Sequence, residues 1–169
     1  GASVATPACS SSATSAATTT PPAAKQLPAA ASDNLVSNGG AELGPTAGDD
    51  AATVPPQGWT TSGNFTAVKY GSTGSTGGLP DTAVSSSING GVSMFAGGAK
   101  NASSSAMQTV AVPHSWLKAV SAGQVTATVS ADLGGWQDQP DAATVTYVFL
   151  DTSGTAVGSV KIGPVTPAR

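Results

Sequence analysis

Charged side chains are scarce in this chain of 169 residues, since they make up 9% of it against about 25% in average soluble domains. The six lysines and arginines form no cluster that could neutralise phosphates, and the net charge of −3 also argues against a nucleic-acid partner. No apolar run approaches the roughly 18 to 20 residues that cross a bilayer, so we expect no membrane insertion. Few charges beside many small and hydroxylated residues are typical of a secreted or cell-surface all-β protein.

Cysteine, histidine and glutamate each occur once, as Cys9, His114 and Glu42. A single cysteine excludes a disulfide within the chain, and the ligands of a zinc site are missing. As a general base, His114 would need a positioned nucleophile and an orienting carboxylate, and its neighbour Ser115 is no evidence of that geometry. One Glu and eight Asp single out no pair of facing carboxylates for glycoside hydrolysis. The sequence therefore predicts a protein that is not an enzyme.

The first 32 residues are a low-complexity segment that includes the run "SSSATSAATTTPPAA". Small, hydroxylated and proline residues bury too little apolar area to offset the entropy of ordering the backbone. We therefore expect residues 1–32 to be a disordered tail or spacer. From residue 33 onward, short β-rich runs alternate with Gly, Pro, Asp and Ser, which predicts one folded domain over residues 33–169.

Strand patterns dominate this second segment. Residues 124–133, "QVTATVSADL", alternate strictly between apolar and polar side chains, which indicates a strand with one solvent-facing side. The run "ATVTYVFL" at residues 143–150 is followed by the turn "DTSG", so "TAVGSVKIG" is expected to be its hairpin partner. Three shorter runs are further candidate strands, at residues 65–70, 92–95 and 106–112. Only residues 114–120, "HSWLKAV", have helical spacing, as an α-helix or a 3₁₀ turn. The pattern predicts an antiparallel β-sandwich.

The order of several short motifs resembles galactose-binding-domain-like jelly-roll domains. The motifs are "NLVSNGGAELG", "PPQGW", "GNFTAVKY", "AMQTVAV" and "ADLGGWQDQPDAATVTYVFLDTSGTAVGSV". More distantly, they resemble the sugar-binding domain associated with some F-box proteins. The resemblance spans roughly residues 34–166 and implies a jelly-roll fold. That superfamily contains carbohydrate-binding modules, lectins, cell-wall-binding proteins and accessory domains of hydrolases, and the fold does not decide among them.

A sugar-binding site needs an aromatic platform for the apolar face of a pyranose, with polar groups for its hydroxyls. Trp136 fits this role, since it lies in a glycine-flanked loop beside three polar residues: Gln137, Asp138 and Gln139. The alternative is that Trp136 covers one end of the sandwich, as we expect Trp59 and Trp116 to pack. Tyr70, beside a glycine-rich loop, is a second candidate platform.

The turn "SNGGAE" at residues 37–42 has two open interpretations. The resemblance implies a structural calcium ion whose ligands include a glutamate in this position. By that reading Glu42 and Asn38 would be ligands and Asp141 a candidate partner, although the C-terminal segment lacks the acidic residue that often completes such sites. Alternatively, Glu42 bonds backbone amides in the turn or pairs with a lysine.

These observations predict a secreted, non-catalytic, lectin-like module that docks on a polysaccharide or cell-wall glycan. The alternative is a structural or adhesive cell-surface protein that binds a protein partner or its own copies. The sequence specifies neither the sugar nor the oligomeric state.

Overall fold

The computed structural model describes residues 3–5, 34–49, 51–74, 77–135 and 141–165. In the described part of the chain, strands make up 30% and helices 12%, in agreement with the predicted all-β character. The strands form small antiparallel sheets, and a closed jelly-roll sandwich is not among the features described.

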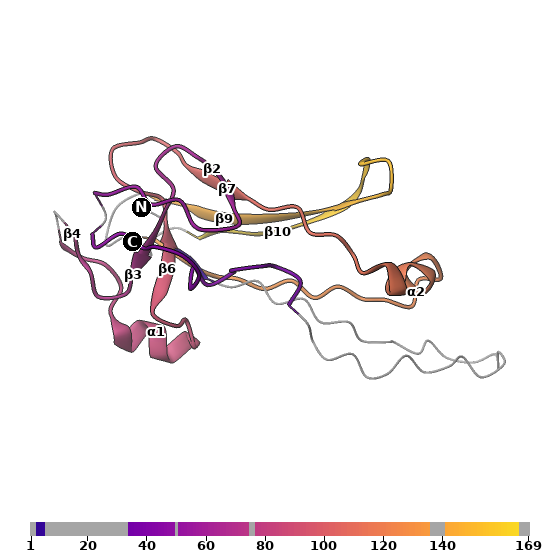
Figure 1. Ribbon diagram of the computed structural model, residues 1–169, viewed down its shortest axis with the longest axis horizontal. Helices are drawn as coiled ribbons and strands as arrows, with labels where there is room; N and C mark the ends of the chain where they lie inside the picture. Colours follow the sequence, from indigo (N-terminus) through magenta and orange to yellow (C-terminus); the bar gives the residue numbers. More distant parts are fainter. Residues whose placement is uncertain (1–2, 6–33, 50, 75–76, 136–140, 166–169) are drawn as a thin grey trace.

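The largest sheet has four antiparallel strands in the order β3 (Thr66–Lys69), β6 (Ser93–Ala96), β1 (Ser3–Ala5) and β8 (Asp132–Gly134) (Figure 1). β3 and β6 confirm two of the shorter predicted strands. β1 is a strand inside the segment for which the sequence predicted a disordered tail, and residues 6–33 of that segment lie outside the described part of the chain.

Three smaller elements surround this sheet. β2 (Thr60–Ser62) pairs with β7 (Ser105–Met107), and β4 (Thr73–Gly74) pairs with β5 (Gly77–Gly78). Helix α1 (Thr82–Ile88) begins where the side chain of Asp81 accepts a hydrogen bond from the Val84 N–H. It ends at Asn89, which adopts the left-handed conformation. We did not predict this helix, because its Ser-rich, β-branched sequence has low helix propensity and only its two caps signal it.

The core lies on both faces of β3 and β6, because successive side chains of a strand point to opposite sides. Val68 and Met94 pack on one face, in a cluster with three further residues: Ala47, Tyr70 and Ala96. On the other face Phe95 contacts the rings of Phe65 and Trp59, at centroid distances of 5.6 and 5.3 Å. The predicted packing of Trp59 is confirmed.

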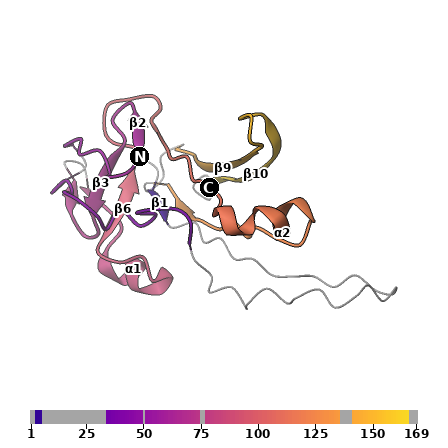
Figure 2. The same cartoon turned by 45° about the vertical axis from the view of Figure 1, so that its right-hand side comes forward.

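The rest of the chain extends away from this core. β9 (Ala143–Leu150) and β10 (Ala156–Val165) form the predicted hairpin, closed by a turn at Asp151. The predicted helical segment is present as a 3₁₀ turn, η1 (His114–Trp116), that continues into α2 (Leu117–Ser121). Figures 1 and 2 both place α2 and the hairpin tip at the far end from β3, β6 and α1.

The clearest predicted strand, residues 124–133, is wrong as a strand over most of its length. Only its end belongs to a strand, as β8, and in the described structure residues 124–131 are assigned to no strand. The predicted facing holds in part, because Val125 and Val129 are half-buried and Thr126 and Thr128 are exposed, but Ala127 is exposed as well. Similarly, only the first part of residues 106–112 is in β7.

The molecule has two regions. The compact end comprises residues 34–108, 132–135 and 141–143, with β1. The distal arm comprises residues 109–131 and 144–162, that is, the segment with η1 and α2 together with most of the β9–β10 hairpin.

Candidate functional site

Asn38 organises the turn with which the folded domain opens. Its φ of 50° is in the left-handed region, which asparagine tolerates better than most residues. Its side-chain Oδ1 accepts a hydrogen bond from the Leu43 N–H at 2.8 Å, and its Nδ2 donates to the carbonyls of Leu43 and Gln57 at 3.2 and 2.9 Å. One amide side chain thus closes its own turn and joins it to the segment before β2.

Two other side chains extend this network to distant parts of the sequence. The indole N–H of Trp59 donates to the Asn38 carbonyl at 3.1 Å. Gln108 accepts from the Ser37 N–H at 2.8 Å and donates to the carbonyls of Ser37 and Gly58 at 3.1 and 2.9 Å. The turn, the start of β2 and the residue after β7 are therefore held in one polar network.

Glu42 connects the turn to β6. Its Oε1 accepts hydrogen bonds from the backbone N–H groups of Val92 and Ser93, both at 2.9 Å. A Cβ added at Gly91 would collide with this oxygen, so the glycine allows the carboxylate to approach the backbone. Of the interpretations open from the sequence, binding to backbone amides is the one observed, but the amides lie at the start of β6 and not in the turn itself. We call Asn38, Glu42, Trp59 and Gln108 the opening clasp.

The same contacts bear on whether these residues suit a calcium ion. Asn38 Oδ1 and Glu42 Oε1 each face N–H donors, the opposite of what a cation requires, so the fit to calcium is poor. Asp141 is half-buried just before β9. The part of the chain that the structure describes contains no group of three or more His, Cys, Asp or Glu residues placed to hold a metal. The calcium site stays a prediction, and the contacts observed for the side chains of Asn38 and Glu42 are hydrogen bonds.

Tyr70 is a core residue and not an exposed platform, which corrects the sequence prediction. Its side chain is 7% exposed and packs with Val68 and Met94. Burial raises the pKa of its hydroxyl above the ordinary value, and the nearby carboxylates of Asp132 and Glu42 raise this pKa further, because they disfavour a second negative charge. A ring in this position cannot stack on a sugar.

The predicted sugar-binding loop is described only at its two ends. Trp136, Gln137, Asp138 and Gln139 lie outside the described residues. Before them, β8 ends at Gly134; after them, Ala143 begins β9 and is 2% exposed. The loop therefore starts and finishes on strands that are each paired with a neighbour.

Sequence reasoning missed a second polar network, which closes the loop between β6 and β7. Asn101 accepts from the Asn64 N–H at 2.8 Å and donates to the carbonyls of Gly97 and Gly98. Asn64 donates in turn to the Ala99 carbonyl at 2.7 Å. The signal in the sequence was a pair of asparagines close to glycines, since Asn64 follows Gly63 and Asn101 comes three residues after Gly98. Both residue types tolerate unusual backbone conformations.

None of the described helices is long and apolar enough to span a membrane. Comparisons with protein-family models, with curated proteins and with solved structures found no match to this chain.

Proposed function

We propose that this protein is a secreted, non-catalytic module that binds a neutral glycan through the loop containing Trp136. The proposal includes the jelly-roll sandwich implied by the sequence resemblance, of which the small antiparallel sheets would be parts. In this proposal the loop binds the glycan, and the remainder of the compact end holds the loop in place.

The observation that carries the proposal is the attachment of the loop at both ends. β8 pairs with β1 through three residues, and β9 pairs with β10 along most of its length. Ala143, the first residue of β9, is buried, which fixes the point where the chain leaves the loop. A binding loop on paired strands loses less conformational entropy on binding than a loop without such support.

The other aromatic candidates at the compact end are already engaged in packing. Trp59 donates its indole N–H to Asn38 and places its ring edge-on against Phe95. Tyr70 is buried. Trp136 is the other tryptophan whose sequence neighbours belong to the compact end. Beside it, Gln137, Asp138 and Gln139 supply hydrogen-bond donors and acceptors suited to sugar hydroxyls.

Composition favours a neutral ligand over a charged one. With 9% charged residues, the chain offers few cations to bind an acidic polysaccharide and few carboxylates to bind a basic one. Stacking on one ring, with a few hydrogen bonds, gives modest affinity after the cost of association. Such a module is expected to act on extended or insoluble glycans, where many weak contacts add together.

The test is a pull-down on insoluble polysaccharides together with a glycan array, using the full chain and the variant Trp136→Ala. Loss of one stacked ring is expected to weaken binding by about tenfold or more. The matched control is Trp116→Ala, which removes a half-buried tryptophan from η1 in the distal arm and should leave binding unchanged. Equal loss in both variants, or no binding to any glycan by a folded wild-type protein, would overturn the proposal.

A further inference from the structure

Asparagine is followed directly by glycine at two places in this chain, Asn38–Gly39 and Asn89–Gly90. In such a dipeptide the backbone nitrogen of the glycine can attack the side-chain carbonyl carbon of the asparagine. Glycine favours this reaction because it has no side chain to hinder the approach or the backbone rotation that the approach requires. The two dipeptides are alike, so a large difference in their reactivity would come from the fold.

Asn38 is held against this reaction through both its side chain and its backbone. Its side-chain amide makes three hydrogen bonds, with the N–H and carbonyl of Leu43 and with the carbonyl of Gln57. Its backbone carbonyl accepts from the Ala41 N–H at 3.3 Å and from the Trp59 indole N–H at 3.1 Å. The attack requires the side chain to turn and the backbone to rotate at Asn38, so these contacts must open together.

Asn89 has far fewer contacts to lose. It is exposed at the end of α1, with a φ of 54° and a ψ of 41°. Among the described residues, no hydrogen bond involves its side chain or its backbone carbonyl. The rotation breaks the bond from the Gly90 N–H to the Ser85 carbonyl, which measures 2.8 Å. That bond lies at a helix end, where local opening costs little free energy.

The segment that follows Asn89 is closely held. A Cβ at Gly90 would lie 2.7 Å from the Tyr70 hydroxyl oxygen, and a Cβ at Gly91 would collide with the Glu42 carboxylate. The Gly91 carbonyl also accepts a hydrogen bond from the buried hydroxyl of the helix residue at position 85. Any lengthening of the backbone at this point would therefore disturb its neighbours.

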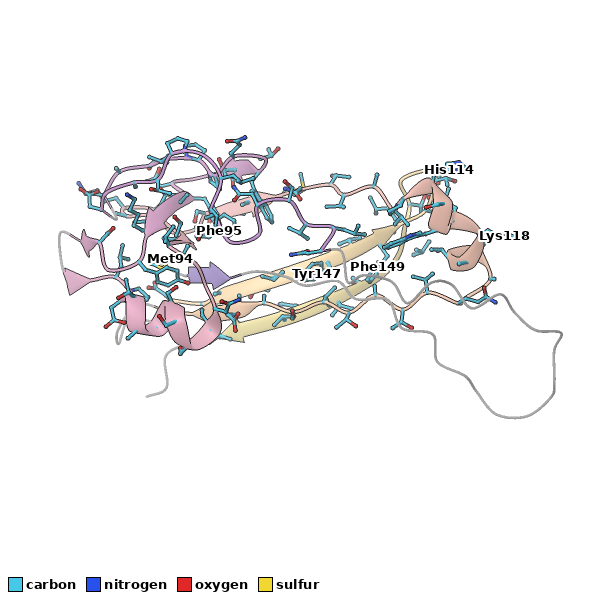
Figure 3. The ribbon with its side chains drawn as sticks, turned by 60° about the horizontal axis from the view of Figure 1, so that its bottom comes forward. Met94, Phe95, His114, Lys118, Tyr147 and Phe149 are labelled. Atoms are coloured by element: carbon cyan, nitrogen blue, oxygen red, sulfur yellow. The ribbon has the colours of Figure 1, made fainter. Side chains whose placement is uncertain are left out.

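The same segment leads directly into β6. The N–H groups of Val92 and Ser93 are the donors that Glu42, in the opening clasp, binds. Met94 and Phe95 come next and belong to the two buried clusters of the core. Figure 3 shows both of them at the same end of the molecule as α1. A change at Asn89 is therefore close, along the chain, to the clasp and the core.

We propose that Asn89 is a site of spontaneous deamidation and isomerisation to isoaspartate. The Gly90 nitrogen loses its proton and bonds to Cγ of Asn89, the side-chain nitrogen leaves as ammonia, and a five-membered succinimide forms. Water then adds to one of the two ring carbonyls, and the bond from that carbonyl to the ring nitrogen breaks. Opening at the former backbone carbonyl gives isoaspartate, and opening at the former side-chain carbonyl gives aspartate. Water is the only other reactant.

Isoaspartate adds one carbon atom to the main chain between α1 and Gly90. Because the segment after it is closely held, the added atom displaces Gly90 and loosens the hydrogen bonds of Glu42 to the start of β6. Modification should therefore lower the melting temperature of the protein by several degrees. The loop that contains Trp136 takes no part, so this inference is independent of glycan binding.

The test is incubation of the full chain at mildly alkaline pH, where the glycine N–H loses its proton more readily, followed by tryptic digestion. Cleavage after Lys69 and Lys100 gives fragment 70–100, in which Asn89 is the only asparagine, while Asn38 lies in fragment 26–69. Mass spectrometry with electron-transfer fragmentation locates the modified residue and distinguishes isoaspartate from aspartate. Each hydrogen bond that must open lowers the reactive population by roughly fivefold, so Asn89 should be modified at least about tenfold faster than Asn38.

The same incubation in urea is the control for the contribution of sequence. Without the fold, the two dipeptides should react at similar rates. Equal rates in the folded protein, or a difference of the same size in urea, would overturn the proposal.

Trp59→Phe is the matched variant at the protected dipeptide, because it removes the indole donor to the Asn38 carbonyl. It should speed the modification of Asn38 by roughly fivefold and leave the rate at Asn89 unchanged. An unchanged rate at Asn38 would show that these hydrogen bonds do not protect it, which would contradict the basis of the proposal.

Asn89→Gly tests the consequence for stability. Glycine adopts the left-handed conformation at a helix end without strain and cannot deamidate. The melting temperature of this variant should stay constant during an incubation in which that of the wild type falls as fragment 70–100 is modified. An equal fall in both proteins, or no fall in a wild type that is fully modified at Asn89, would overturn the predicted effect on the clasp.

Discussion

The compact end and the distal arm have similar strand-forming sequences but very different burial. β3 and β6 have side chains buried on both faces, with Val68 at 0% and Phe95 at 2% exposed. The hairpin has an equally apolar sequence, yet Val148 and Leu150 remain about half exposed. The difference comes from what surrounds each pair of strands. Ala41, Ala47, Val54 and Trp59, all within residues 34–59, pack on the sheet of the compact end. In the described part of the chain, the arm has only its own connecting segments beside it (Figures 1 and 2).

The two regions also differ in the sequence range of their hydrogen bonds. Gln108 and Glu42 join segments 50 to 71 residues apart. In the arm, Asp151 bonds residues two and four positions away, and the contact between Tyr147 and Ser130 spans 17 residues. Long-range contacts make a region unfold as a unit, while local ones allow it to open independently. We therefore expect the two regions to respond differently to the same kind of substitution.

The largest expected difference is between Met94→Ala and Val157→Ala. Met94 is 1% exposed, so its truncation leaves a cavity and should lower the free energy of unfolding by about 2–5 kcal/mol. Val157 is 68% exposed in the arm, and its truncation should change that free energy by no more than about 0.5 kcal/mol. Urea unfolding at low protein concentration measures both. Similar losses in the two variants would show that the arm contributes to the same core.

A smaller loss of stability is expected when a hydrogen-bond acceptor of the opening clasp is removed. Glu42→Ala removes the acceptor of two backbone N–H groups and should cost about 1–3 kcal/mol, toward the lower value because the carboxylate is exposed. Leu43→Ala, at the adjacent exposed position, is the control and should cost much less. Thermal unfolding of both variants measures the difference.

The same measurement tests the calcium prediction. If the clasp consists of hydrogen bonds alone, EDTA should leave the melting temperature of the wild-type protein unchanged. A melting temperature that falls with EDTA and recovers with calcium, in the wild type but not in Glu42→Ala, would show that the carboxylate also binds a cation.

Sequence reasoning predicted local features better than distant contacts. The hairpin, its turn at Asp151, the strands β3 and β6, and the helical segment at His114 follow from alternation, turn residues and helical spacing. It failed over residues 124–131, because a strand also needs a neighbour to supply backbone partners. Glu42 was singled out because it is the only glutamate, but its partners at residues 92 and 93 depend on how distant segments meet.

The two tyrosines offer a further comparison, since Tyr70 lies at the compact end and Tyr147 in the arm. The pKa of Tyr70 is raised above its ordinary value of 10.0, because burial disfavours the charged form. The folded protein therefore holds this proton more tightly than the unfolded chain. The resulting stability is fully present below pH 10 and is lost as the pH rises through the folded-state pKa.

Ultraviolet titration of the Tyr147→Phe variant, in which Tyr70 is the only tyrosine, measures this pKa directly. The midpoint is expected to lie higher in the folded protein than in urea. Equal midpoints would show that Tyr70 is open to water. The contrast in burial between the compact end and the arm would then not hold at this residue.

The smallest effect is expected at the turn of the arm. The pKa of Asp151 is lowered from 3.8, first by the hydrogen bond from the Ser153 hydroxyl and then by the Thr155 N–H. A lowered pKa means that the ionised carboxylate stabilises the folded turn above the ordinary value, and that this contribution is lost as the pH falls through the folded-state pKa. Because the carboxylate is fully exposed, the effect on overall stability should be small.

NMR titration of the Thr155 amide tests this, with Asp151→Asn as the variant that should abolish the titration. A midpoint at or above the ordinary value would contradict the hydrogen bonds of the turn. Repeating the titration in Met94→Ala extends the test to the whole molecule. If the arm folds on local contacts, the midpoint should not change when the compact core is weakened. A changed midpoint would show that the turn depends on a core that it does not touch, and the two regions would then have to be treated as one cooperative unit.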